Sequence, residues 1–152
     1  MKWKHPHIIK IYEALGTIAN NRLEISGNVG KVFSSNRNKF YEIQYDPGTQ
    51  SIMSNDNASY WVGSLGYPAI AFLMKIGALL FDSQLASLLK GIEWKNINQK
   101  FKNDFDKSLE YVLSSKSEEE RNGLKKFAEK VDKEIKKLNL NLLGKKKFPP
   151  RD

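Results

Sequence analysis

The feature that most constrains the fold is a strand pattern followed directly by a tight turn. From Phe40 to Tyr45, aromatic and branched residues alternate with other residues, so every second side chain faces the same way. Asp46-Pro47-Gly48 comes next. Proline presets φ and glycine accepts positive φ, as tight turns require. The chain is therefore predicted to reverse here, and residues 50–54 to pair back as a strand.

A helix and two further strands are predicted before this hairpin. Pro6 suits the first turn of a helix, and apolar residues follow it at helical spacing, which predicts a helix over residues 6–19. Leu23 and Ile25 then alternate with polar residues, Gly27 to Gly30 supplies turn residues, and residues 31–33 resume an extended pattern. Residues 22–54 are thus predicted to form a small antiparallel β meander.

The chain becomes helical from Pro68 onward. Residues 69–80 are apolar nearly all round, which predicts the most buried helix, and further helices are expected over 83–89 and 96–114. Ser117 and Glu120 have the spacing of a capping box, and the apolar stripe after them predicts a helix to about Leu138. The short link between the last two helices implies an antiparallel hairpin.

These patterns predict an α+β fold: an N-terminal helix, the meander, a buried helix and a C-terminal antiparallel helical hairpin. Residues 1–143 are predicted to form a single domain, and residues 144–152 a basic, flexible tail. The chain contains no cysteine, which excludes disulfides and thiolate zinc sites and is compatible with a reducing compartment. The most apolar stretch is shorter than the roughly 20 residues that span a bilayer. We therefore expect a soluble, cytoplasmic protein without a membrane partner.

The charge of the chain is positive and uneven. The formal net charge is +8, with +5 in residues 1–40 and +5 in residues 116–152. A basic surface attracts phosphate backbones, but lysines greatly outnumber arginines here, which also fits a simple bias of residue usage. If the charge is functional, the predicted nucleic-acid-binding residues are Lys31, Arg37, Lys39, Lys145, Lys146 and Lys147.

Two other groups are candidates for a site. His5 and His7 could hold zinc only with further ligands, and none is obvious nearby, so no metal or other cofactor is predicted. The segment from Ser59 to Pro68 is rich in aromatic residues and glycine, and it could line a pocket or contact surface or cover an edge of the core. The residues proposed for that pocket or contact loop are Asp56, Tyr60, Trp61 and Tyr67.

One family resemblance covers about residues 31–75. Lys31 to Ser35, Tyr41-x-Ile43, the Pro-Gly turn and Gly66-Tyr67-Pro68 before an apolar helix together resemble a SWIM-type ββα finger. The resemblance implies zinc ligands at about Ile52, Ser54, Ala69 and Ala71, and none of these side chains is a thiolate or imidazole. It therefore implies a degenerate finger in which apolar packing replaces the metal, and a role in binding nucleic acid or protein.

The sequence leaves more than one function open. No catalytic constellation is identifiable, so an enzyme is not the prediction, although a site near Asp56 stays an alternative. The principal hypothesis is a non-enzymatic binding module for nucleic acid. The alternative is a protein-interaction or structural domain that associates with itself or with a partner protein.

Overall fold

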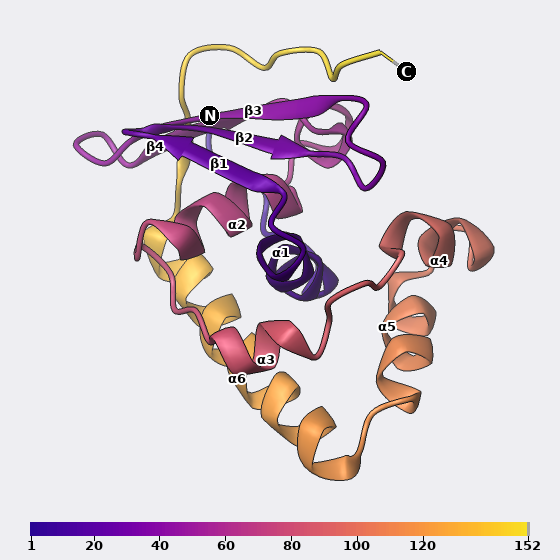
Figure 1. The fold of residues 1–152 in the computed structure, drawn as a ribbon. Coiled ribbons are helices and arrows are strands. Elements are labelled where there is room, and N and C mark those ends of the chain that lie inside the picture. Colours follow the sequence, from indigo (N-terminus) through magenta and orange to yellow (C-terminus); the bar gives the residue numbers. More distant parts are fainter. Residues whose placement is uncertain (152) are drawn as a thin grey trace.

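A sheet lies across one side of the molecule and a layer of helices lies beneath it (Figure 1). The structure is a computed structural model, and it describes residues 1–151. The strands are β1 (Leu23–Ser26), β2 (Val29–Phe33), β3 (Phe40–Asp46), β4 (Ser51–Ser54) and β5 (Asn141–Leu142). The helices are α1 (Ile9–Ala19), the π-helical turn η1 (Ala58–Val62), α2 (Tyr67–Lys75), α3 (Ser83–Ser87), α4 (Trp94–Lys100), α5 (Phe105–Ser114) and α6 (Glu118–Leu138). The predicted α+β class and element order are confirmed.

The sheet is a meander with one added strand. Its order is β1-β2-β3-β4-β5; the first four strands are antiparallel neighbours, and β5 is parallel to β4. Gly27 and Asn28 form the first turn, and Gly27 has a φ of 60°. The β3–β4 hairpin reverses after Asp46, as the Asp-Pro-Gly sequence predicts. The short β5 was not predicted, because two residues carry no alternation pattern.

The main core lies between the sheet and the helices α1 and α2. Every residue of α2 from Pro68 to Met74 is buried, so the prediction of a buried helix here is confirmed. Gly30 in β2 lies close to Phe72 in α2: a Cβ on Gly30 would lie 2.6 Å from Cδ2 of the ring. Glycine at this position lets the backbone of β2 rest directly on a fully buried aromatic side chain.

Several predicted helix bounds differ from those observed. The first helix begins at Ile9 rather than at residue 6, so Pro6 precedes it. The buried helix ends at Lys75 rather than near residue 80, because Gly77 adopts a φ of +84° and its N–H bonds back to Met74. The predicted helix over 96–114 is broken into α4 and α5. Lys102 and Asn103 have φ values of 53° and 62°, and Asp104 then caps α5 by accepting a hydrogen bond from Lys107 N.

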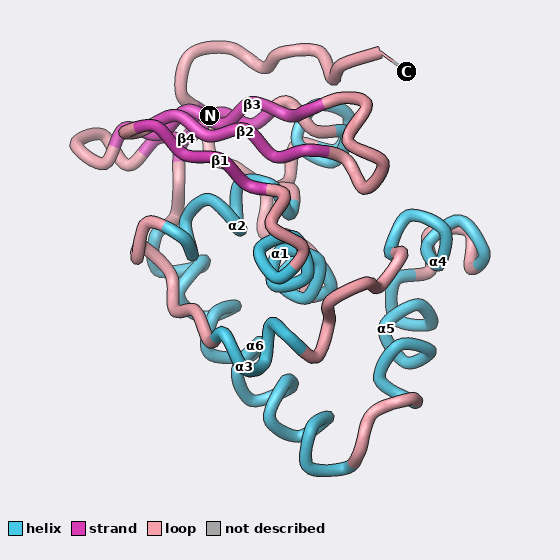
Figure 2. Tube along the Cα trace, in the orientation of Figure 1, coloured by secondary structure: helices cyan, strands magenta, loops and turns pink. Residues whose placement is uncertain are grey.

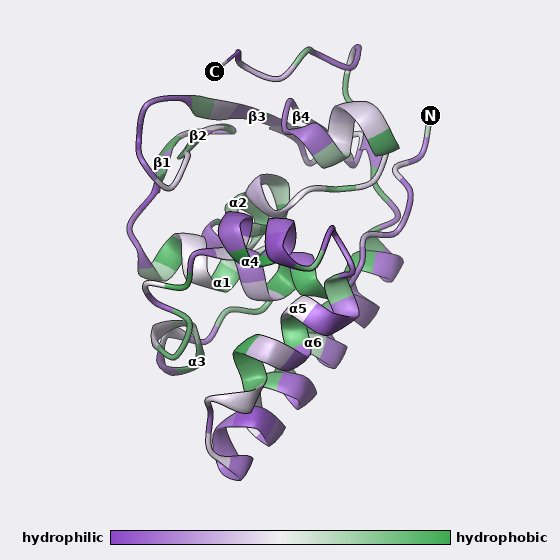
Figure 3. Cartoon of the chain, turned by 90° about the vertical axis from the view of Figure 1, so that its right-hand side faces the viewer, coloured by the Kyte–Doolittle hydropathy of each residue, from purple (hydrophilic) through white to green (hydrophobic). Residues whose placement is uncertain are grey.

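The last helix starts where the capping box predicts. Ser117 Oγ accepts from Glu120 N at 3.1 Å, and Ser117 N donates to Glu120 Oε1 at 2.9 Å. The helices α5 and α6 run in opposite directions and diverge from their shared link, and both contact α1 (Figure 2). The buried residues of α6 form one stripe, whereas its other side is hydrophilic (Figure 3). The stripe consists of Leu124, Ala128, Val131 and Ile135.

The two ends of the chain meet at the β4 edge of the sheet. Leu142 N donates to Met1 O at 2.7 Å, and Lys2 forms an isolated bridge with Asn141. Beyond β5, residues 143–151, called here the C-terminal tail, cross the face of the sheet that is turned away from the helices (Figures 1 and 3). That face is called the outer face below. Within residues 1–151, no helix has both the length and the apolar character needed to cross a membrane.

Candidate functional site

The outer face of the sheet carries most of the predicted binding residues. Val32 and Ile43 are fully buried on the inner face, so the residues that alternate with them point outward. Lys31 is exposed there, between Glu24 of β1 and Glu42 of β3 in the strand register. Phe33 and Phe40 are opposite each other at the end of the β2–β3 hairpin.

Cations lie beside both of these rings. The rings of Phe33 and Phe40 have centroids 6.0 Å apart, and Lys31 Nζ lies 4.8 Å from the centroid of Phe40. The Arg37 guanidinium lies 5.9 Å from the centroid of Phe33 and donates to Asn21 O at 3.0 Å. Lys39 is partly buried in the same hairpin loop. The structure thus places Lys31 and Arg37 beside the two rings at one end of the sheet, and Lys39 belongs to the same hairpin loop.

Carboxylates offset the charge of this hairpin. Glu24, Glu42 and Asp46 fall on the outward positions of their strands. Glu24 and Glu42 flank Lys31 in the strand register, and Asp46 lies at the other end of β3, so the outer face of the hairpin is not by itself strongly positive.

The C-terminal tail brings further positive charge to the same face. It contains Lys145, Lys146, Lys147 and Arg151 and no acidic residue among positions 143–151. Three hydrogen bonds attach it: Leu143 N donates to Ile52 O at 3.0 Å, Asn55 Nδ2 donates to Phe148 O at 3.3 Å, and Lys146 Nζ donates to Tyr60 O at 3.4 Å. In β4, Met53 points to the outer face, whereas the residues on either side of it point inward. Only 1% of Met53 is exposed, as expected for a side chain that the tail covers.

An aromatic cluster marks the point where the tail meets the sheet. It consists of Tyr60 and Trp61 from η1 and Phe148 from the tail. The rings of Tyr60 and Phe148 have centroids 4.6 Å apart at 31°, and the Trp61 ring is 4.7 Å from Tyr60 and 6.4 Å from Phe148. Trp61 is 66% exposed and Phe148 is 70% exposed. These two large apolar side chains therefore keep most of their surface in water.

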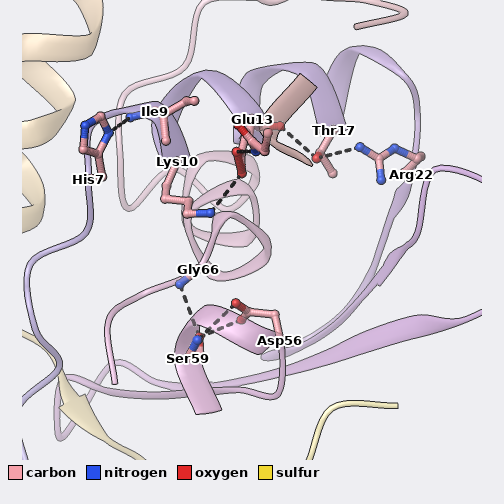
Figure 4. A network of polar contacts seen from close by, with 10 residues as sticks. His7, Ile9, Lys10, Glu13, Thr17, Arg22, Asp56, Ser59 and Gly66 are labelled. Atoms are coloured by element: carbon pink, nitrogen blue, oxygen red, sulfur yellow. Dashed lines mark hydrogen bonds and ion pairs between the residues drawn. The ribbon is translucent and has the colours of Figure 1, made fainter. Parts of the chain in front are cut away.

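A buried carboxylate fixes η1 beneath this cluster. Asp56 Oδ1 accepts from the hydroxyls of Ser54 and Ser59, each at 2.6 Å, and Oδ2 accepts from Ser59 N at 3.2 Å. Ser59 Oγ also accepts from Gly66 N at 3.2 Å (Figure 4). A Cβ on Gly66 would lie 1.8 Å from Asp56 Oδ2, so a side chain there would displace the carboxylate. Asp56 is thus a structural anchor for η1 and the start of α2.

Tyr67, which was grouped with Asp56, Tyr60 and Trp61 in the predicted pocket, lies apart from the aromatic cluster. Its ring packs edge-on to Tyr41 at 6.4 Å between centroids and lies 6.0 Å from the Arg22 guanidinium. Burial raises the pKa of Tyr67 well above its usual range, and the Arg22 cation acts in the opposite direction. Tyr67 is therefore a neutral phenol on the inner side of the sheet, whereas Tyr60 and Trp61 belong to the outer site.

The charged groups of α1 and the histidines form contacts away from the outer face. Lys10 Nζ lies 3.3 Å from Glu13 Oε1 in a largely buried pair (Figure 4). His5 contacts Asp132 of α6 at 2.6 Å, and His7 contacts Asp106 of α5 at 2.9 Å. In the part of the chain that the structure describes, no group of three metal-ligating side chains is assembled.

The positions that the SWIM resemblance aligns with zinc ligands are all interior. Ile52, Ala69 and Ala71 are fully buried in the main core, and Ser54 is 2% exposed. Ser54 uses its hydroxyl for the bond to Asp56. Apolar contacts and this hydrogen bond occupy the region where a finger of that type would hold its metal.

The sequence patterns did not identify three aromatic residues of the outer face as candidate site residues. Phe148 looked like an isolated residue in a tail without periodicity, and Phe33 and Phe40 looked like ordinary strand residues. The available signal was that each has a basic residue within two positions, since aromatic and basic residues interleave in surfaces that bind nucleic acid. Lys31, Lys39 and Lys147 are those neighbours.

Comparisons with known proteins give one match. The model of a family described as "Uncharacterised conserved protein UCP014422" matches residues 3–141, which include nearly all of the folded elements. No curated protein and no solved structure matches the chain.

Proposed function

This chain belongs to the family of uncharacterised conserved proteins UCP014422, and we propose that it is a non-enzymatic module that binds nucleic acid in the cytoplasm. The binding surface in this proposal is the outer face of the sheet together with the C-terminal tail. One observation carries the proposal: basic residues from two distant segments, the β2–β3 hairpin and the tail, lie on the same face.

Positive charge from distant segments of the chain converges on one face. This convergence favours a functional role for the charge over a simple bias of composition toward lysine. A bias toward lysine scatters cations over every exposed surface, and it gives no reason for a basic tail to be attached across a sheet. Here the backbone of the tail accepts a side-chain hydrogen bond from Asn55, and its Lys146 reaches η1. The tail supplies net positive charge, and the hairpin adds cations stacked beside Phe33 and Phe40. Phosphate backbones are attracted by such a surface.

The proposal predicts salt-dependent binding through the tail. A labelled single strand of about 12 nucleotides, within the site sizes of single-strand binders, is titrated by fluorescence anisotropy at several salt concentrations. Each phosphate contact contributes about 0.7 to the slope of log K against log salt on single strands. Replacing Lys145, Lys146 and Lys147 together by glutamine is expected to lower this slope by up to about 2.

A matched variant separates a local site from net charge. Lys125, Lys126 and Lys130 are exposed on α6, and replacing all three by glutamine removes the same charge from another surface. This control is expected to keep the wild-type slope nearly unchanged. Equal losses in both triple variants would contradict a site on the outer face, and no binding by the wild type at low salt would contradict the proposed function itself.

The alternative function is self-association, and a different surface of the molecule favours it. Ile76, Leu80 and Phe81, in the link after α2, are 37%, 49% and 36% exposed, so this segment presents apolar side chains to solvent. A stable dimer in light scattering, together with no oligonucleotide binding at low salt, would favour this alternative. A monomer that binds the labelled strand would exclude it as the main role.

A further inference from the structure

The aromatic cluster adds a second kind of recognition to the outer face. Trp61 and Phe148 hold two-thirds or more of their surface in solvent, although the ring of Tyr60 lies within 4.7 Å of both. Exposed tryptophan and phenylalanine side chains side by side are uncommon on a soluble surface and mark a binding site more often than a packing defect. The nearest charged groups on the tail are Lys145, Lys146 and Lys147.

The cluster is held in place before any ligand arrives. Tyr60 and Trp61 sit on η1, whose start is fixed by the Asp56 carboxylate and whose end is fixed by Gly63 in a left-handed conformation. Phe148 is fixed through its own carbonyl, which accepts from Asn55, and through Lys146, which reaches Tyr60 O. Rings held in this way lose little conformational freedom when a flat ligand stacks on them.

The chemistry of these groups fits unpaired nucleobases. An aromatic face binds a base by stacking whatever the sequence, and a neighbouring lysine neutralises the phosphate that follows the base. Bases inside a duplex stack on each other and do not offer their faces, whereas single strands do. The second pair of rings, Phe33 and Phe40, lies on the same face. Asn55, which holds the tail, accepts a hydrogen bond from Glu42 N of β3, and Glu42 pairs with Lys31 of β2. A strand lying across the sheet can meet both groups.

Resting on the proposed function, we propose that Trp61 and Phe148 form a base-stacking platform and that the preferred ligand is single-stranded nucleic acid. The tail lysines hold the backbone, and the two rings discriminate a single strand from a duplex. Glu42 lies between the two aromatic groups. Its negative charge repels the phosphates of a bound strand and therefore limits affinity at the centre of the binding surface.

Tryptophan fluorescence can report on this site directly. Trp3 and Trp94 are 8% and 7% exposed, so Trp61 is the one well-exposed tryptophan of the chain. Titration with an oligothymidine of about 12 nucleotides is expected to quench the Trp61 emission. A duplex of the same length at the same salt concentration is expected to quench it little.

Alanine variants then test the contribution of each ring. Trp61→Ala and Phe148→Ala are each expected to weaken single-strand binding at least fivefold and to leave duplex binding within about twofold. Trp61→Phe retains an aromatic face and is expected to recover much of the affinity. Tyr111→Ala is the matched control, because Tyr111 is 48% exposed and has Lys100 Nζ 4.4 Å from its ring centroid, but lies on α5. It is expected to have no effect.

The outcomes separate this inference from the proposed function. Wild-type binding that depends on the tail lysines but not on Trp61 or Phe148 would overturn the stacking platform and leave the proposed function intact. Equal losses on single strand and duplex would also overturn it. No binding of either nucleic acid by the wild type at low salt would overturn both. Thermal melting of each variant verifies that a loss of affinity is not a loss of folding.

Discussion

Replacing Phe72 by alanine is expected to lower the free energy of unfolding by about 3–5 kcal/mol, the usual cost of removing a fully buried phenylalanine. Phe72 is fully buried at the centre of α2, and its ring lies against the backbone of Gly30. The Tyr45 ring packs edge-on to it at 6.1 Å. Alanine would leave a cavity between the sheet and the helix layer, and a glycine backbone cannot move in to fill it without distorting β2.

Urea unfolding followed by circular dichroism measures this loss, and Phe148→Ala is the matched control. Phe148 is 70% exposed, so its removal takes little apolar surface from the folded state and is expected to change the unfolding free energy by less than about 0.5 kcal/mol. Similar losses in the two variants would contradict the assignment of α2 to the centre of the core.

The second large effect is expected at Asp56. Replacing it by alanine is expected to lower the free energy of unfolding by about 3 kcal/mol. Asp56 is 4% exposed and accepts three hydrogen bonds, from two serine hydroxyls and one backbone N–H. Alanine leaves these buried donors without a partner, and each unsatisfied buried group costs about 1–3 kcal/mol. The variant should also loosen η1 and therefore weaken single-strand binding through Trp61.

Asp46→Ala is the control for this prediction. Asp46 is also an aspartate that accepts from a backbone N–H, here Gly48 N at 3.0 Å, but it lies at the end of β3 and this hydrogen bond is exposed to solvent. Its loss is expected to cost about 1 kcal/mol or less, because water can satisfy the freed donor. Thermal and urea unfolding of both variants decide the matter. A cost at Asp56 no greater than that at Asp46 would show that the network does not anchor η1.

The strongly periodic parts of the fold could be predicted from the sequence. The meander, the buried helix after Pro68 and the capping box of α6 each follow from local spacing and turn chemistry, and each is found. The break between α4 and α5 could not be predicted from periodicity, because Ile97, Phe101, Phe105 and Leu109 keep helical spacing across it. Asn103 and Asp104 override that spacing through a left-handed backbone and a capping bond.

The site was harder to predict than the fold, because its parts are distant in the sequence. Lys31 and Lys146 share a face only because β5 returns the chain to β4 and the tail then crosses the sheet. The aromatic segment after β4 is predicted either to line a pocket or contact surface or to cover an edge of the core. The structure divides it between the outward rings of Tyr60 and Trp61, the buried Asp56 and the inward Tyr67. No feature of the local sequence predicts which of these side chains point outward and which point inward.

The most direct test of the binding account is a map of the contact surface in solution. Backbone amide shifts of the 15N-labelled protein are followed by NMR as an unlabelled oligothymidine is added. The largest changes are expected on the outer face and its tail, in residues 29–33, 40–42, 60–62 and 145–148. Changes concentrated on the lysine-rich exposed side of α6, or no changes at low salt, would contradict the account.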